Sequence, residues 1–195
     1  LLESVVSDGG LRSVSMPIVA ARESYFEAGL EILADTGFGG LKLAEVCGRL
    51  GVTSGSFYHY FANWAAYTRQ LVDYWRQDRT VRLIELIRAQ PNPRKRLEAV
   101  ISVGLTLPHG AEAAIRSWSS VDADVMAIQR EVDQQRYDII YESALTIVNC
   151  SAQARTYASW AVDVFVGYEQ STLPKDLRMF EWICTTMLDL SLIHI

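Results

Sequence analysis

The sequence predicts an all-α protein in two parts, a small three-helix unit followed by a larger helical bundle. Apolar residues recur every three or four positions over most of the 195 residues, which is the period of an amphipathic helix. No stretch alternates between apolar and polar residues as a half-buried β-strand would. Half of the residues are hydrophobic, so a chain of this length is able to bury a substantial core.

The first helix is expected over residues 20–36, and its apolar residues share one face. Gly37 should end this helix, because a residue without a Cβ atom adopts the left-handed conformation at little cost. Phe38 is expected to pack into the core of the three-helix unit. The apolar face consists of Tyr25, Phe26, Gly29, Leu30 and Leu33.

Residues 41–61 predict two short helices joined by a tight turn. The first should end at Gly51, and Thr53 is suited to cap the second. The second helix has aromatic residues along one edge and small or polar residues along the other. Such a helix can bury the aromatic edge and place the other against a groove, as the second helix of a helix-turn-helix does in DNA.

A longer set of residues extends this pattern. It comprises Ala28–Leu30, Gly37–Phe38, Leu43, Val46–Cys47, Leu50–Thr53, Gly55–Tyr58 and Phe61. Through these residues, the segment 22–61 resembles the DNA-binding domain of TetR-family transcriptional regulators. The resemblance implies a double-stranded DNA operator as partner, contacted by Lys42, Thr53, Ser54, Gly55, Ser56, Tyr58, His59 and Tyr60. For His59 the alternative is an ordinary solvent-facing residue, and Phe57 and Phe61 are expected to be core residues.

The expected DNA-binding surface carries few positive charges. Many TetR-family members have a lysine where this chain has Trp64 and another where it has Ser54, while Lys42 replaces a common threonine. The formal net charge is −5, so affinity for phosphates would depend on the local surface. The alternative function is a TetR-like fold retained as a small-molecule or protein binding module with weak or lost DNA binding. The basic residues between positions 17 and 70 are Arg22, Lys42, Arg49 and Arg69.

The second part should begin with a long helix that Asn63 caps and that continues to about Ala89, ahead of two prolines. Further helices are expected over residues 94–107, 111–120, 121–149 and 151–170, and from Leu173 onward. The predicted domains are a disordered or non-native arm (1–19), a helix-turn-helix domain (20–62) and a helical bundle (63–192). Met16 is the expected natural start, and a minor-groove contact through Arg12 is the alternative for the arm. The ending, residues 190–195, resembles a translated adapter sequence.

The bundle also resembles part of the TetR family, through residues 114–118, 132–136 and 167–169. In that family the last two long helices pair with those of a second subunit, which implies a homodimer. The small-residue face of residues 151–167 suits such close packing, although an ordinary buried helix inside a monomer is the alternative. The expected interface residues are Ala154, Ala158, Ala161, Phe165, Ile183 and Met187.

The resemblance further implies a pocket between the helices of the bundle for an unknown small-molecule effector. Aromatic residues at helical spacing are the candidates to line it, and plain core packing is the alternative for each of them. The candidates are Trp75, Trp118, Tyr137, Tyr141, Tyr157, Trp160 and Phe165.

No pattern in the sequence indicates catalysis, a cofactor or a metal site. His109 and Glu112 stand three residues apart without a further ligand, and the three cysteines have no metal-binding spacing. There is no glycine-rich phosphate loop. Neither a membrane span nor a cleavable signal is evident, so the sequence predicts a soluble cytoplasmic protein that is not an enzyme.

Overall fold

The computed structural model describes residues 18–193 and the side chains of residues 22–189. The expected arm up to residue 17, with Met16 and Arg12, and the end of the adapter-like tail at residues 194–195 lie outside the described residues. Every regular element in the described range is helical, as the sequence predicts. The elements are α1 (Ile18–Thr36), η1 (Phe38–Gly40), α2 (Leu43–Leu50), α3 (Ser54–Tyr60), α4 (Trp64–Arg76), η2 (Gln77–Val81), α5 (Arg82–Arg88), α6 (Pro93–Thr106), α7 (His109–Ser119), α8 (Ala123–Val148), α9 (Ser151–Gln170) and α10 (Leu177–Ile193).

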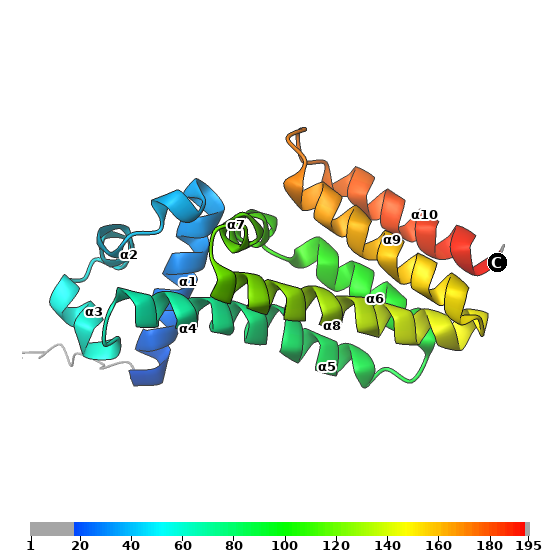
Figure 1. Ribbon diagram of the computed structural model, residues 1–195, viewed down its shortest axis with the longest axis horizontal. Coiled ribbons are helices and arrows are strands. Elements are labelled where there is room, and N and C mark those ends of the chain that lie inside the picture. Colours follow the sequence, from blue (N-terminus) through cyan, green and yellow to red (C-terminus); the bar gives the residue numbers. More distant parts are fainter. Residues whose placement is uncertain (1–17, 194–195) are drawn as a thin grey trace, which may run out of the picture.

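Helices α1, α2 and α3 form the small N-terminal unit, and α3 lies at the opposite end of the molecule from α10 (Figure 1). Gly51 ends α2 in the left-handed conformation, with a φ of 65°. The Thr53 hydroxyl accepts a hydrogen bond of 3.3 Å from the amide of Ser56 at the start of α3. The turn and the cap that the sequence predicts are therefore confirmed.

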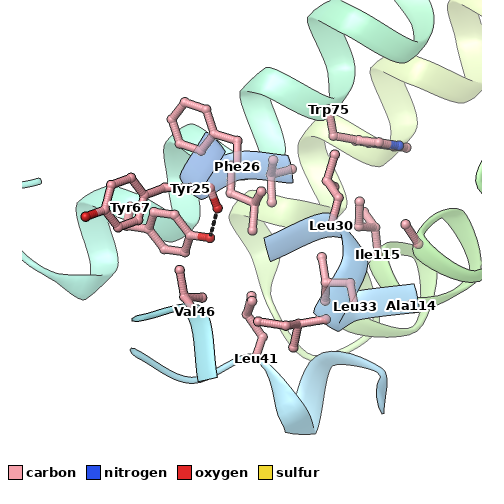
Figure 2. Packing of buried hydrophobic residues seen from close by; sticks show 14 of the residues in the cluster. Tyr25, Phe26, Leu30, Leu33, Leu41, Val46, Tyr67, Trp75, Ala114 and Ile115 are labelled. Atoms are coloured by element: carbon pink, nitrogen blue, oxygen red, sulfur yellow. Dashed lines mark hydrogen bonds between the residues drawn. The ribbon is translucent and has the colours of Figure 1, made fainter. Parts of the chain in front are cut away.

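An aromatic cluster joins this unit to α4. Phe57 and Phe61 are buried in it, as predicted, and the Phe57 ring lies 5.3 Å from the ring of Tyr67. The Tyr67 hydroxyl donates a hydrogen bond of 2.8 Å to the carbonyl of Tyr25 (Figure 2). Gly29 is required beside this pair, because a Cβ atom at that position would overlap the Tyr67 hydroxyl.

The prediction that Phe38 packs into the core of the three-helix unit is wrong. Phe38 lies on the short turn η1 and is 39% exposed. Its ring stacks on Trp118 of α7, with 4.4 Å between the centroids and 14° between the planes. The reason is that η1 faces α7, so the ring bridges the N-terminal unit and the bundle.

Helices α4 and α5 form a rod that leads from the N-terminal unit into the bundle. Asn63 caps the rod by accepting a hydrogen bond of 2.8 Å from the amide of Ala66, and Ala89 ends it, as predicted. The π-helical turn η2 joins the two helices, which the sequence pattern does not reveal. Such turns are rare and often occur at functional sites. This one places Thr80 in the interior, where it is 1% exposed.

Helix α8 is the centre of the bundle. It packs against α4 and α5 on one side and against α6, α7 and α9 elsewhere, while α10 lies on α6 and α9 (Figure 1). The last helix begins at Leu177, four residues later than expected. Lys175 explains the delay, because its ammonium donates to the carbonyls of Tyr168, Glu169 and Ser171 and so holds a loop at the end of α9.

The buried apolar residues form two clusters. The first, part of which Figure 2 shows, joins α1–α4 with α7 and the start of α8. The second fills the bundle between α5, α6, α8, α9 and α10. Helix α7 sits close to α1, since a Cβ atom on Gly110 would lie 3.1 Å from Ala34. The N-terminal unit is therefore packed directly on one helix of the bundle.

Candidate functional sites

The outward face of α3 is the first candidate site. Phe57 and Phe61 anchor this helix in the aromatic cluster, and the other residues of the helix are exposed or half-buried. The side chain of Tyr58 is 53% exposed there. The exposed residues on this helix are Ser54, Gly55, Tyr58 and His59.

Other predicted contact residues surround this face. Thr53 is exposed at the cap, and Ser56 is half-buried beside it with 3.3 Å between the two hydroxyl oxygens. Tyr60 is half-buried, and its ring lies 5.5 Å from that of Tyr25. Lys42 is exposed at the start of α2. The fold thus brings the predicted residues together on one end of the N-terminal unit.

Few positive charges are available near this end. Arg49 forms ion pairs of 2.8 Å with Asp35 and 3.3 Å with Glu31. Arg22 donates to the neutral amide of Gln70 and lies over the ring of Phe61. Among the described residues of this unit and the start of α4, Arg22, Lys42 and Arg69 are exposed and form no ion pair.

Trp64 stands where a lysine is common, and the structure gives it a packing role. It is half-buried, and its ring lies 5.9 Å from that of Phe57 and 5.0 Å from that of Tyr67. Trp64 therefore packs against the buried side of α3. The substitution therefore replaces a cation with a support for the helix that carries the exposed face.

The second candidate site is a cavity inside the bundle, with a volume of about 110 Å³. Its wall is almost entirely apolar and comes from α5, α6, α8, α9 and α10. One end is polar, and the turn η2 supplies two of the four polar residues there. The polar residues are Arg79, Thr80, Asp133 and Arg136, and the apolar wall includes Ile84, Leu97, Ile101, Ile140, Val164 and Met187.

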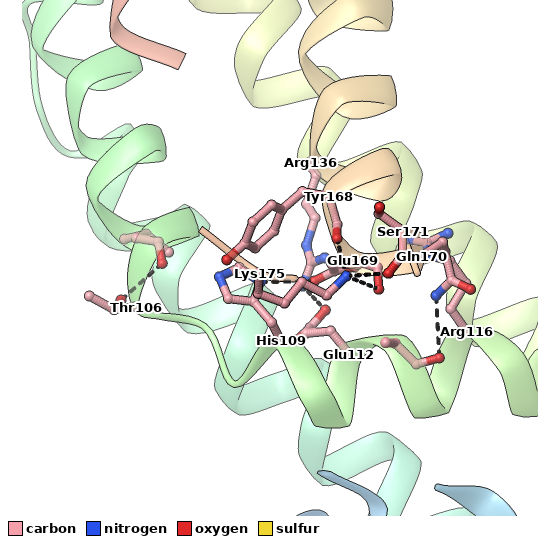
Figure 3. A network of polar contacts seen from close by, with 12 residues as sticks. Thr106, His109, Glu112, Arg116, Arg136, Tyr168, Glu169, Gln170, Ser171 and Lys175 are labelled. Atoms are coloured by element: carbon pink, nitrogen blue, oxygen red, sulfur yellow. Dashed lines mark hydrogen bonds and ion pairs between the residues drawn. The ribbon is translucent and has the colours of Figure 1, made fainter. Parts of the chain in front are cut away.

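A buried polar network adjoins the polar end of the cavity (Figure 3). Arg136 donates from Nη2 to Glu112 Oε2 at 2.8 Å and to Thr80 Oγ1 at 3.3 Å. The other oxygen of Glu112 accepts a hydrogen bond of 2.7 Å from the indole of Trp75 on α4. Trp75 is fully buried in the cluster that holds the N-terminal unit. A continuous chain of hydrogen bonds therefore runs from the cavity to the rod.

Further charged pairs complete the network. Arg116 donates twice to Asp133, at 2.7 and 2.8 Å, and His109 Nδ1 lies 3.4 Å from Glu169 Oε1. Burial lowers the pKa of Arg116, but Asp133 outweighs this and leaves that pKa raised. For Glu169 burial acts in the opposite direction and raises the pKa of the carboxyl group. The hydrogen bond with His109 opposes this rise only in part.

The N-terminal unit matches a known family. Residues 26–66 match the family model described as bacterial regulatory proteins of the tetR family. The match covers the N-terminal unit and the start of α4, and in this part the chain is similar to that family. No curated protein sequence matches the chain at a significant level.

Solved structures share the TetR-family fold over most of the chain. A transcriptional regulator from Rhodococcus sp. Rha1 is 17% identical, with a TM-score of 0.73 over 88% of this chain and 96% of that one. A regulator from Saccharomonospora viridis in complex with choline is 11% identical, with a TM-score of 0.72 over 88% and 96%. FadR from Bacillus subtilis in complex with stearoyl-CoA is 15% identical, with a TM-score of 0.65 over 89% and 98%.

The cavity contains two of the seven predicted pocket residues, Tyr157 and Phe165. Trp75 and Trp118 belong instead to the cluster around the N-terminal unit, because α4 and α7 turn them toward α1. Tyr137 and Tyr141 stack on each other along α8, with centroids 6.0 Å apart, and Trp160 is 49% exposed. Helical spacing alone did not tell which face of each helix meets the cavity.

Three of the residues predicted for the dimer interface are buried inside the subunit. Ala154 and Ala158 are completely buried against the rest of the bundle, and Met187 is 5% exposed and lines the cavity. The small-residue face of α9 packs on α8 within the subunit. Ala161 and Phe165 also line the cavity, and Ile183 is half-buried.

A different surface of α9 and α10 is apolar and exposed. Trp160 projects from α9, and Trp182 of α10 is 65% exposed. Solvent exposure of two tryptophans on adjacent helices is unusual for a surface without a partner. We call this surface the α9–α10 patch, and it consists of Trp160, Leu177, Met179 and Trp182.

The network residues were missed as functional positions. In the sequence, Arg116, Asp133 and Arg136 stand out only as part of the resemblance to the TetR family, and Glu112 only as a poor candidate for a metal ligand. The available signal was a set of charged residues at the inward positions of α7 and α8. Among the described residues, no three His, Cys, Asp or Glu side chains converge on a possible metal position, and no helix is long and apolar enough to cross a membrane.

Proposed function

We propose that this TetR-family regulator represses transcription by binding a palindromic DNA operator as a homodimer, and that a small molecule in the bundle cavity releases it. The observation that carries this proposal is the hydrogen-bonded chain from the cavity through Arg136 and Glu112 to Trp75. Trp75 lies on α4, the rod that also supports α3. Occupation of the cavity is thereby linked to the position of the exposed α3 face.

Proteins of the same fold support a small-molecule ligand. Regulators of the same fold were solved in complex with choline and with stearoyl-CoA. Those two molecules differ in charge and size, so they support a small-molecule effector without identifying it. Since the DNA target would be chromosomal, the proposed place of action is the bacterial cytoplasm.

The α9–α10 patch supports a homodimer, because two identical apolar patches bury each other in a twofold interface. A Trp182→Glu substitution should convert a dimer to a monomer in light scattering coupled to gel filtration. Leu86→Glu is the matched control, since Leu86 is 71% exposed on α5 and lies outside the patch. A wild-type protein that is monomeric at micromolar concentration would contradict the homodimer.

DNA binding is tested by selecting sequences from a random double-stranded library at low salt and measuring their affinity by fluorescence anisotropy. Lys42→Ala should weaken binding and reduce the salt dependence by about one phosphate contact. Lys95→Ala is the matched control, because Lys95 is exposed on α6 in the bundle. Enrichment of sequences whose affinity is equal for both variants would argue against the α3 end as the reading surface.

The alternative is a small-molecule or protein binding module that has lost its affinity for DNA. The specific observation in its favour is the small number of cations without an ion pair near α3, which among the described residues are Arg22, Lys42 and Arg69. Failure of the selection to enrich any sequence, together with ligand binding in the cavity, would support this alternative.

A further inference from the structure

We infer that the cavity takes a small monocarboxylate, with its apolar body between the bundle helices and its carboxylate on the guanidinium of Arg136. The inference deepens the proposed function and rests on it in one respect, because it takes the cavity to be the effector site. Four properties of the cavity lead to this ligand class: its size, the unpaired guanidinium donors at its polar end, the engagement of its one described acidic side chain, and the neighbouring charge balance.

The size and lining of the cavity set the body of the ligand. Its volume of about 110 Å³ is somewhat below that of an engineered apolar cavity, about 150 Å³, that admits benzene. Aliphatic side chains from five helices make up most of the wall, and the aromatic residues Tyr157, Phe165 and Phe180 complete it. A compact hydrocarbon body fits this space, whereas a sugar or a nucleotide would leave polar groups against aliphatic carbon.

The polar end offers a hydrogen-bond donor without an acceptor. Arg136 lines the cavity, and its Nη2 is used by Glu112 and Thr80. Its Nη1 is buried and has no acceptor among the described residues. The Phe165 ring covers the same guanidinium, with Cζ 5.3 Å from the ring centroid. A buried donor on a cation is costly to leave unpaired, so this atom favours a ligand with an acceptor oxygen.

The only acidic side chain in the described lining cannot serve a cationic ligand well. Asp133 already accepts two hydrogen bonds from Arg116 and a third, of 3.1 Å, from Gln129. The second guanidinium at this end, that of Arg79, adds positive charge near the same position. An amine or quaternary ammonium would therefore meet two guanidinium groups and no free carboxylate.

The charge balance limits the ligand to one negative charge. Arg79 lies 3.5 Å from Glu27 and 3.3 Å from Asp78, and Arg136 is paired with Glu112. Each guanidinium is already partly neutralised, so a phosphate or a dicarboxylate would cost more to bury in this site of low polarity than a ligand with one negative charge. A single carboxylate can accept from Arg136 Nη1, and Arg79 Nε at the same end is also buried without a hydrogen-bond partner among the described residues.

Such a carboxylate would also act on the network. It would share the Arg136 guanidinium with Glu112, and this weakens the hold of Arg136 on Glu112 Oε2. Glu112 is in turn the acceptor for Trp75, so the change at the cavity reaches α4 through one side chain. The geometry thus assigns Arg136 two roles, binding the ligand head and positioning Glu112.

The test measures binding directly, so it does not depend on DNA. Isothermal titration of the full chain would compare octanoate with octanol and octylamine, which keep the body and change the head. Butanoate and dodecanoate would test the body size. We expect octanoate to bind at least about tenfold more tightly than octanol and octylamine, as one charge-assisted hydrogen bond requires. Equal or tighter binding of octanol, octylamine or choline would overturn the inference.

Variants locate the site. Arg136→Met should weaken octanoate at least about tenfold and leave octanol within about twofold, whereas Arg88→Met should change neither. Arg88 is the matched control because it also pairs with a glutamate, Glu142, but at the exposed surface. Arg88 lies on α5, and Glu142 lies on α8, the helix that carries Arg136. If Arg136→Met does not fold, Arg136→Met with Glu112→Gln leaves no unpaired buried charge, and the same loss is expected. An unchanged octanoate affinity in either folded variant would overturn the inference.

Failure of the proposed function gives a different result. If octanoate binds through Arg136 but selected DNA is bound equally with and without it, the ligand class stands and effector control of DNA binding does not. If DNA binding is normal and the carboxylates do not bind, the inference fails and the regulator remains.

Discussion

The indole of Trp75 donates a 2.7 Å hydrogen bond to Glu112, whose other oxygen accepts 2.8 Å from Arg136. Glu112 is 2% exposed, so this carboxylate joins the rod, α7 and α8 inside the protein. The packing of α4 on α7 and α8 and the proposed coupling of the cavity to α4 therefore both depend on Glu112.

Glu112→Ala should lower the free energy of unfolding by about 3–5 kcal/mol, because it leaves the Arg136 charge buried without its partner. Chemical denaturation followed by circular dichroism measures this loss. Glu142→Ala is the control, since Glu142 pairs with Arg88 at the surface, and its loss should stay within about 1 kcal/mol. Similar losses for the two variants would show that the buried pair is not special.

Gly29→Ala should destabilise the protein by about 1–3 kcal/mol, because the new methyl group would displace the Tyr67 hydroxyl. Gly48→Ala is the matched control on an exposed helical position with open space around it. It should be neutral or stabilise by up to about 1 kcal/mol, owing to the helix propensity of alanine. The measurement is again denaturant unfolding, and a harmless Gly29→Ala would refute the close contact.

Glu169→Gln should stabilise the protein at neutral pH and not at acid pH. Burial raises the native pKa of Glu169 above its unfolded value of about 4.3. Between these two values the native state binds more protons than the unfolded state, so the free energy of unfolding falls as pH rises through that window. Glutamine removes this loss, and the difference from wild type should vanish as pH falls to about 4.

Thermal unfolding between pH 4 and pH 8 checks this prediction. Glu98→Gln is the control, because Glu98 is exposed on α6 and pairs with Arg94 at the surface. A Glu169→Gln protein that is less stable than wild type at pH 7 would mean that His109, Arg116 and Arg136 hold Glu169 in its charged form.

The cysteines should differ in reactivity. Burial raises the pKa of the Cys184 thiol, which lines the cavity, to about 11. At pH 8 only about one Cys184 in a thousand would be a thiolate, so a disulfide reagent should modify it slowly. Labelling rates of Cys184→Ser and Cys150→Ser proteins, compared with the unfolded chain, separate the two sites. Rapid labelling of native Cys184 would show that the cavity is open to the reagent.

The N-terminal unit was predictable because its determinants are local. Gly51 and Thr53 fix a turn and a cap through their own backbone and hydroxyl groups, and the aromatic residues of α3 repeat at helical spacing. Phe38 was misplaced because its partner, Trp118, is 80 residues away, and no local pattern reports such a pairing.

The cavity and the patch depended on how each helix is rotated. A residue such as Ala158 reads equally well as a subunit contact or as a core residue, and its burial depends on where α8 and α9 meet. The same holds for two tryptophans that read as pocket residues from their apolar character. Trp75 faces the N-terminal core, and Trp160 faces the solvent.

The sequence by itself determined the helical class, the helix-turn-helix and the extent of most helices, since periodicity, caps and breakers act over a few residues. Only the tertiary structure decided that Glu112, Arg136 and Trp75 form one buried chain beside the cavity. These residues lie 24 and 37 positions from Glu112, and their meeting depends on the packing of α4, α7 and α8. Charged residues on inward helical faces become interpretable once their partners in space are known.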